Sequence, residues 1–111
     1  MTGLFSSVCT LHVPESKAIA RVLSRLFGNP ENAKVIGVSY LKHYPEHANL
    51  ELLLDVLGPD LATLATTDSH ALLNHIHALQ RQDFIDGETV IVNNWILSRT
   101  EASMCALLVL A

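Results

Sequence analysis

The sequence predicts an all-α fold: a compact bundle of four to five short helices, with one extended connector before the C-terminal helix. Three observations support this prediction. The chain has 111 residues and half of them are hydrophobic, which suits one domain with a substantial core. Apolar residues recur at helical spacing along most of the chain. Only residues 89–92 read as a strand, and one strand has no partner with which to form a sheet. We therefore expect a single helical domain over residues 1–111.

The first half of the chain contains two well-marked helix starts. Residues 1–12 are expected to form a short helix or an ordered arm. Pro14 suits the first position of the next helix, and Gly28 suits a left-handed cap at its end. Asn29 followed by Pro30 starts a further helix, which Pro45 ends.

One glycine lies inside this second helix. Gly37 costs about 1 kcal/mol there relative to alanine. Either another backbone packs closely against Gly37, or the helix is weak. A third helix is expected over residues 47–57, where Gly58 and Pro59 end it.

The second half of the chain adds a short helical turn over residues 61–65 and a fourth helix from a cap at residues 67–69 to about Gln82. The extended connector follows the turn at Asp86 and Gly87. Residues 98–101 match a capping box, with Ser98 as N-cap and Glu101 reaching back to it. The last helix, residues 99–111, is apolar around most of its girth, so it must be central or covered.

The charged fraction of the chain is low, at 16%, against the roughly 25% usual for soluble domains. A small domain has much surface, so the shortage indicates an apolar exterior of the kind that marks an interface; a surface of Ser, Thr, Asn and His is the alternative. The net charge of −4 and the absence of a Lys/Arg cluster argue against nucleic acid. The longest apolar run, residues 105–111, is too short to span a bilayer.

The chain shows no motif for catalysis. Cys9 and Cys105 lie at opposite ends and are expected to be buried free thiols. Asp83 and Asp86 are expected to be solvated turn residues, and no nucleophile elbow or phosphate-binding loop occurs. We therefore expect no catalytic residues and no enzyme activity from this chain alone.

Six histidines raise the hypothesis of a metal- or haem-binding helical protein. His43 and His47 are four apart, but Pro45 between them breaks the helix that would place both on one face. His70, His75 and His77 are the other candidates. Exposed polar histidines are the simpler interpretation, which we prefer, and we expect neither a metal nor a cofactor in this chain.

The most informative segment is residues 83–107. Trp95 is either a core anchor or an interface anchor. Arg99 lies in the first turn of a helix, where a cation opposes the helix dipole. Its position indicates a carboxylate partner, in this chain or another; a solvated arginine is the alternative.

This segment resembles the C-terminal part of the small subunits of membrane-bound FAD-dependent sugar and polyol dehydrogenases, the family of gluconate, sorbitol, fructose and glucose dehydrogenases. About a quarter of the chain is covered. The family pattern is an Asp-Phe start, a valine-rich stretch, and then Gly-Trp-x-Leu-Ser-x-Thr-Glu-Ala-x-x-Cys-Ala-Leu. The residues that match it are Asp83-Phe84, Val90-Ile91-Val92, Trp95, Leu97-Ser98, Thr100-Glu101-Ala102 and Cys105-Ala106-Leu107.

The resemblance implies a non-catalytic accessory subunit. In the family, FAD and the hydride chemistry belong to a large flavoprotein subunit, and a cytochrome c subunit often takes the electrons. The small subunit is a chaperone-like escort that binds the large subunit, helps it mature and carries the twin-arginine signal that exports both. The residues expected to bind the partner here are Trp95, Leu97, Arg99 and Glu101.

Two departures from the family pattern bear on these expectations. No Arg-Arg pair occurs, so the location is periplasmic and membrane-associated through partners if a leader was removed, and otherwise cytoplasmic. Asn93 and Asn94 replace the residues expected before Trp95, including a glycine. A free-standing helical interaction or regulatory module, as a homodimer, is the alternative function.

Overall fold

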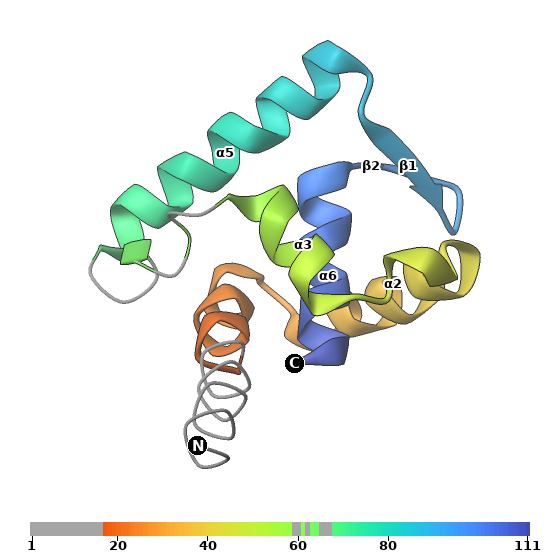
Figure 1. Ribbon diagram of the computed structural model, residues 1–111, viewed down its shortest axis with the longest axis horizontal. Helices are drawn as coiled ribbons and strands as arrows, with labels where there is room; N and C mark the ends of the chain where they lie inside the picture. The colour runs from red at the N-terminus through yellow and green to blue at the C-terminus, as the bar shows by residue number, and fades with distance from the viewer. Residues whose placement is uncertain (1–16, 59–60, 62, 65–67) are drawn as a thin grey trace, which may run out of the picture.

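A computed structural model describes residues 17–58, 61, 63–64 and 68–111. The described part is mostly helical, as predicted (Figure 1). Residues 17–26 form an unlabelled helix, and residues 61, 63 and 64 are helical. The labelled elements are α2 (Pro30–His43), the 3-10 helix η1 (Pro45–His47), α3 (Leu50–Leu57), α5 (Ser69–Asp86), β1 (Thr89–Val92), β2 (Trp95–Ser98) and α6 (Arg99–Leu110). The arm expected at residues 1–12 and the helix start at Pro14 lie outside the described residues.

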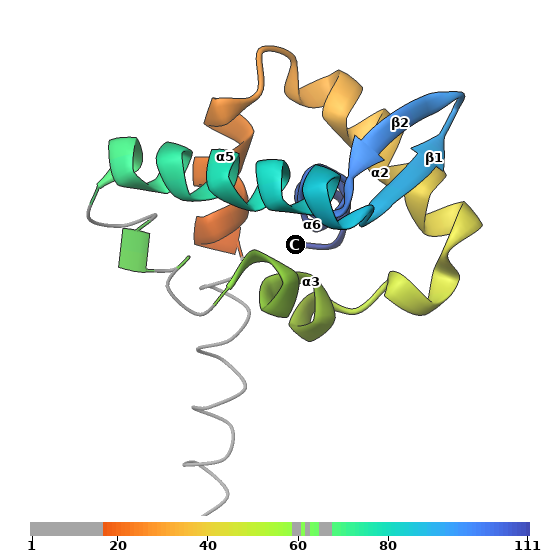
Figure 2. The same ribbon diagram turned by 90° about the horizontal axis from the view of Figure 1, so that it is seen from above.

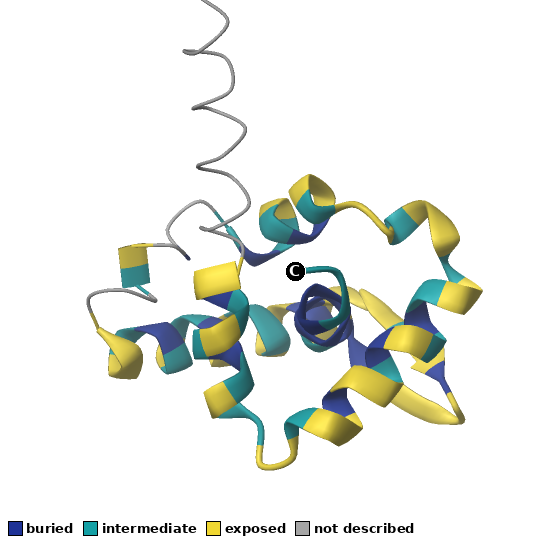
Figure 3. Ribbon diagram, turned by 90° about the horizontal axis from the view of Figure 1, so that it is seen from below, coloured by how far each residue is buried: buried dark blue, intermediate teal, exposed yellow. Residues whose placement is uncertain are grey.

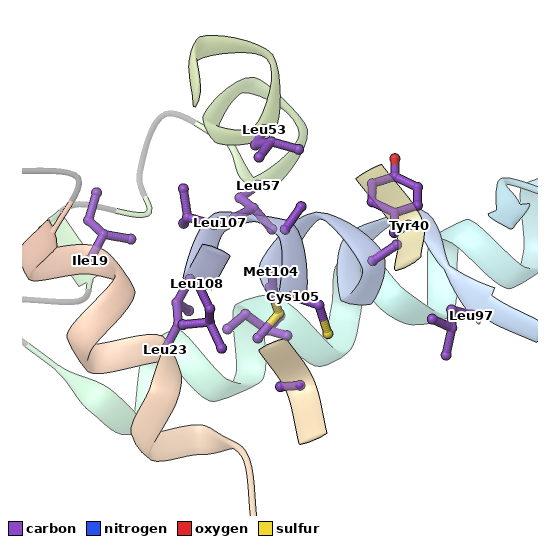
Figure 4. Close-up of a cluster of buried hydrophobic side chains, with 14 of the residues drawn as sticks. Ile19, Leu23, Tyr40, Leu53, Leu57, Leu97, Met104, Cys105, Leu107 and Leu108 are labelled. Carbon is purple, nitrogen blue, oxygen red and sulfur yellow. The ribbon is translucent and has the colours of Figure 1, made fainter. Parts of the chain in front are cut away.

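The C-terminal helix α6 is the centre of the fold. Seen along its axis in Figure 2, it is surrounded by the helix at residues 17–26, α2, α3 and α5. All of its residues from Thr100 to Leu108, except Glu101, are buried. Its side chains meet Leu23, Leu53 and Leu57 in the core (Figure 4). Of the two alternatives that the sequence left open for this helix, a central position in the core or a cover by another element, the structure shows the first.

Gly37 lies at a close contact between α2 and α6. A Cβ atom added there would overlap the carbonyl oxygen of Cys105 and lie 2.7 Å from its carbonyl carbon. Gly37 is therefore in α2 because the backbone of α6 packs against it, which is the first of the two interpretations offered by the sequence.

Residues 89–98 form a β-hairpin, so the prediction of an unpaired connector is wrong. β1 and β2 are antiparallel, with Ile91 opposite Ile96 and Val92 opposite Trp95. Asn93 and Asn94 join the strands with φ values of 51° and 67°. A two-residue turn with positive φ at both positions matches the twist of a hairpin, and asparagine adopts that conformation more readily than most residues.

Several helix boundaries also differ from the prediction. α5 continues to Asp86 and is capped by Gly87 at φ 73°, because no helix-breaking residue lies between Gln82 and Gly87. α3 begins at Leu50, where the side chain of Asn49 accepts a hydrogen bond from the backbone of Leu52. Gly28 does not have the left-handed backbone that was expected of it. No helix in the described ranges is long and apolar enough to cross a membrane.

Candidate functional site

The hairpin presents large apolar side chains to solvent. Ile91, Trp95 and Ile96 are 62%, 69% and 64% exposed, respectively. Ile91 and Ile96 are paired across the strands, so they lie side by side on one face. Figure 3 shows the hairpin as largely exposed, against the buried α6 beside it. Trp95 is paired with Val92 and so lies on the other face, beside the turn, where it is exposed. We call these three exposed residues, Ile91, Trp95 and Ile96, the hairpin patch.

Further exposed apolar side chains lie at the end of α5. Phe84 and Ile85 are also exposed, and they immediately precede the turn into β1. Five of the eight exposed large hydrophobic residues in the described part of the chain thus lie between residues 84 and 96. The shortage of charge in the composition is matched by exposed apolar residues that concentrate in one segment of the sequence.

The opposite face of the hairpin belongs to the core, except at Trp95. Val92 and Leu97 are buried, with Leu97 only 7% exposed. Figure 4 shows Leu97 at the edge of the hydrophobic cluster. Four residues are expected to bind a partner. Trp95 is the most exposed of them, and Arg99 and Glu101 are partly exposed. Leu97 is buried in the core of this chain.

The hairpin is fixed to the first turn of α6 by hydrogen bonds. The Arg99 amide donates to the carbonyl oxygen of Glu88 (3.0 Å). The Glu101 amide donates to the Ser98 side chain (3.0 Å), which is the N-cap bond that the capping box predicts. These bonds use amide groups at the start of α6 that have no partner within the helix.

Asp83 supplies the remaining cap. Its carboxylate accepts from both the amide and the hydroxyl of Thr100, each at 2.7 Å, and its side chain is buried. The expectation that Asp83 is a solvated turn residue is therefore wrong. Seventeen residues separate the two partners, so no local pattern could reveal the contact; the match of Asp83 to the Asp-Phe start of the family pattern was the available signal.

Arg99 has a carboxylate partner in this chain. Its Nη1 lies 3.7 Å from Oε2 of Glu88, and both side chains are about half exposed. The dipole argument indicated a partner of this type. The pair is solvated and beyond hydrogen-bonding distance, so it contributes little to stability.

Tyr40, Tyr44 and His47 form an aromatic cluster where α2 meets η1. The Tyr40 hydroxyl and Nδ1 of His47 share a hydrogen bond of 2.6 Å, and the rings of Tyr44 and His47 stack 5.5 Å apart. His43 instead donates from Nδ1 to the carbonyl oxygen of Ser39 (2.8 Å). His43 and His47 thus take part in separate contacts, as the break at Pro45 predicts.

The other candidate histidines, His70, His75 and His77, share no contact that the structure shows. His75 donates from Nε2 to the carbonyl oxygen of Leu57 (2.9 Å), which ties α5 to the end of α3. His70 and His77 are exposed. No group of three or more side chains that could hold a metal ion occurs among residues 17–58, 61, 63–64 and 68–111.

Cys105 is a buried free thiol, as expected. Burial is the main cause that raises its pKa to about 12, and the nearby Glu101 carboxylate adds to the effect. The thiol is therefore protonated at neutral pH and is not a nucleophile. Cys9 lies outside the described residues.

Comparison of this chain with protein-family models, with curated proteins and with solved structures yields no match.

Proposed function

We propose that this chain is a non-catalytic accessory subunit, which binds the large subunit of a flavin-dependent sugar or polyol dehydrogenase and helps it to mature. The observation that carries the proposal is the hairpin patch. The segment that resembles the dehydrogenase small subunits is also the segment in which exposed apolar side chains gather. Exposed apolar surface of this kind favours a protein partner.

The chemistry of the complex belongs to the partners in this proposal. FAD and the sugar or polyol substrate are bound by the large subunit, and a cytochrome c subunit takes the electrons. The chain itself supplies a rigid hairpin, because the first turn of α6 is hydrogen-bonded to Asp83, Glu88 and Ser98. A pre-organised surface loses less entropy on binding than a mobile one. Membrane association and a periplasmic location would follow from the partners.

The first test is genomic and the second is biochemical. An adjacent reading frame for a large flavoprotein dehydrogenase is expected, and its product should form a stable complex with this chain on co-expression. Trp95→Ser should abolish that complex, whereas Leu52→Ser, which changes an exposed apolar residue on α3, should not. Failure of the wild-type chain to bind, together with unchanged flavin loading of the large subunit, would refute the proposal. A stable homodimer that buries the hairpin patch would favour the alternative of a free-standing interaction module.

A further inference from the structure

A cavity of about 300 Å³ lies between α2, η1, α3, β1 and the first turns of α6. Its apolar lining comes from α3 and β1 and consists of Leu52, Leu53, Val56 and Val90. Its polar lining comes from α2, η1, the start of β1 and α6, and consists of Tyr40, His47, Glu88, Thr89, Arg99 and Ser103. Apolar walls with a few placed polar groups are the usual composition of a small-molecule site.

Ser103 is the buried polar group of this cavity. Its residue is 1% exposed, and its hydroxyl has no hydrogen-bond partner within the part of the chain that the structure describes. Buried hydroxyl groups in native proteins are nearly always paired, because an unpaired one loses its hydration without compensation. Ser103 lines the cavity, and its hydroxyl oxygen is almost fully covered, so a ligand that makes close contact with this oxygen would supply the missing hydrogen bond.

Arg99 lines the same cavity, one helical turn before Ser103. Residues four apart on a helix share a face. The present partner of Arg99, Glu88, is 3.7 Å away and half exposed, so loss of this pair costs little. Glu88 also lines the cavity, so a carboxylate bound at Arg99 must displace the Glu88 side chain toward solvent. The guanidinium group of arginine offers a planar fork of donors that matches a carboxylate.

The other polar residues of the cavity leave Arg99 as the one charged group that would contact an anionic ligand. Tyr40 is buried and shares its hydroxyl with His47. Glu88 is the one acidic residue that lines the cavity, and its side chain is about half solvated. The inner part of the polar lining is therefore formed by the neutral groups of Ser103 and Tyr40, with the cation of Arg99 nearer to solvent.

We propose that this cavity binds a small monocarboxylate with an apolar body, independently of the dehydrogenase partner. The carboxylate is held by Arg99 and Ser103, and the body packs against Leu53 and Val56. A cavity of about 300 Å³ is at the lower end of the range for small-molecule sites, and benzoate is a compact ion that suits such a cavity.

The proposal can be tested by calorimetric titration with benzoate, and with benzyl alcohol as a neutral molecule of similar shape. We expect saturable binding of benzoate to one site, at least tenfold tighter than that of benzyl alcohol. Arg99→Gln should weaken benzoate binding about tenfold, which is about 1.4 kcal/mol, without changing the binding of the alcohol. Ser103→Ala should weaken benzoate binding several-fold while leaving the protein folded, because it removes an unpaired group. Arg81→Gln, which makes the same charge change at an exposed position of α5, is the matched control.

Three results would overturn the proposal. They are no binding of benzoate up to about 10 mM, equal affinity for benzoate and benzyl alcohol, and an equal loss of benzoate affinity in Arg81→Gln and Arg99→Gln. The titration uses the purified chain alone, so its failure is separable from failure of the partner complex.

Discussion

Replacing Gly37 by alanine separates two opposing effects in a single substitution. Helix propensity favours alanine inside α2 by about 1 kcal/mol. Against this, the new methyl group would overlap the carbonyl oxygen of Cys105 and lie 2.9 Å from Cγ2 of Val109. The carbonyl group is backbone inside α6 and cannot rotate away, so the two helices would have to separate.

The size of the net effect follows from the geometry. Moving the Cys105 carbonyl carbon from 2.7 Å to an ordinary contact of 3.4 Å requires a shift of about 0.7 Å, and the carbonyl oxygen, which lies nearer, requires a larger one. Overpacking of a core costs about 1–3 kcal/mol, and rigid backbone on both sides places Gly37→Ala near the upper end. After the propensity gain, the free energy of unfolding should fall by about 2 kcal/mol, which lowers Tm by roughly 8 °C in a domain of this size.

Thermal and urea denaturation followed by far-ultraviolet circular dichroism measure this change. Gly28→Ala is the matched control, because nothing lies within 4 Å of a Cβ added at Gly28; it should be neutral or stabilising by up to about 1 kcal/mol. If Gly37→Ala stabilised the protein as much as Gly28→Ala does, the close approach of α2 and α6 would be wrong, and Gly37 would be a weak point in an unpartnered helix.

Three further substitutions test the C-terminal half. Asp83→Ala leaves the buried amide and hydroxyl of Thr100 without an acceptor and should cost about 2–3 kcal/mol in urea denaturation; a loss no larger than that of the exposed Asp86→Ala would contradict the cap. Asn94→Val should cost about 1–2 kcal/mol, because Asn94 has a φ of 67°, whereas Asn94→Gly should not destabilise; equal stabilities would argue against the turn. Burial raises the pKa of Cys105 from 9.0 to about 12. Above pH 9 the folded state therefore binds more protons than the unfolded state. The free energy of unfolding is unaffected by this group below pH 9 and falls by about 1.4 kcal/mol per pH unit above it. Cys105→Ala should remove its part of that slope, while Tyr40, whose pKa burial also raises from 10.0, still contributes at higher pH; an unchanged slope between pH 9 and 10 would count against the burial.

Local signals in the sequence were sufficient for most of the helices. Asn29 and Asp68 each accept hydrogen bonds from backbone amides two and three residues later, so the bonds that start α2 and α5 lie within a few residues. The central place of α6 was predictable for a related reason. A helix with apolar residues on every side has no stable position at the surface.

The hairpin and the Asp83 cap were not predictable in this way. The turn is Asn-Asn rather than the commoner Asn-Gly. β2 is followed directly by α6, and its last residue, Ser98, is also the first residue of the capping box, so the sequence does not mark β2 as a separate strand. Asp83 and Thr100 are far apart in the sequence and come into contact only in the folded structure. The cavity beside Ser103 combines residues from five elements, which no periodicity reveals.

The hairpin patch can be explained by stability or by binding, and the two explanations predict different results. A cross-strand pair such as Ile91 and Ile96 contributes about 0.2–1 kcal/mol, and threonine favours strands nearly as well as isoleucine does. The double substitution Ile91→Thr and Ile96→Thr should therefore lower the free energy of unfolding by no more than about 1 kcal/mol, because both side chains are exposed and Val92 and Leu97 keep the core face closed. If the patch serves a partner, the same double variant should lose the flavoprotein complex while remaining folded and monomeric. A loss of several kcal/mol would show instead that these isoleucines are covered within the chain, and the argument for a partner would lose its main support.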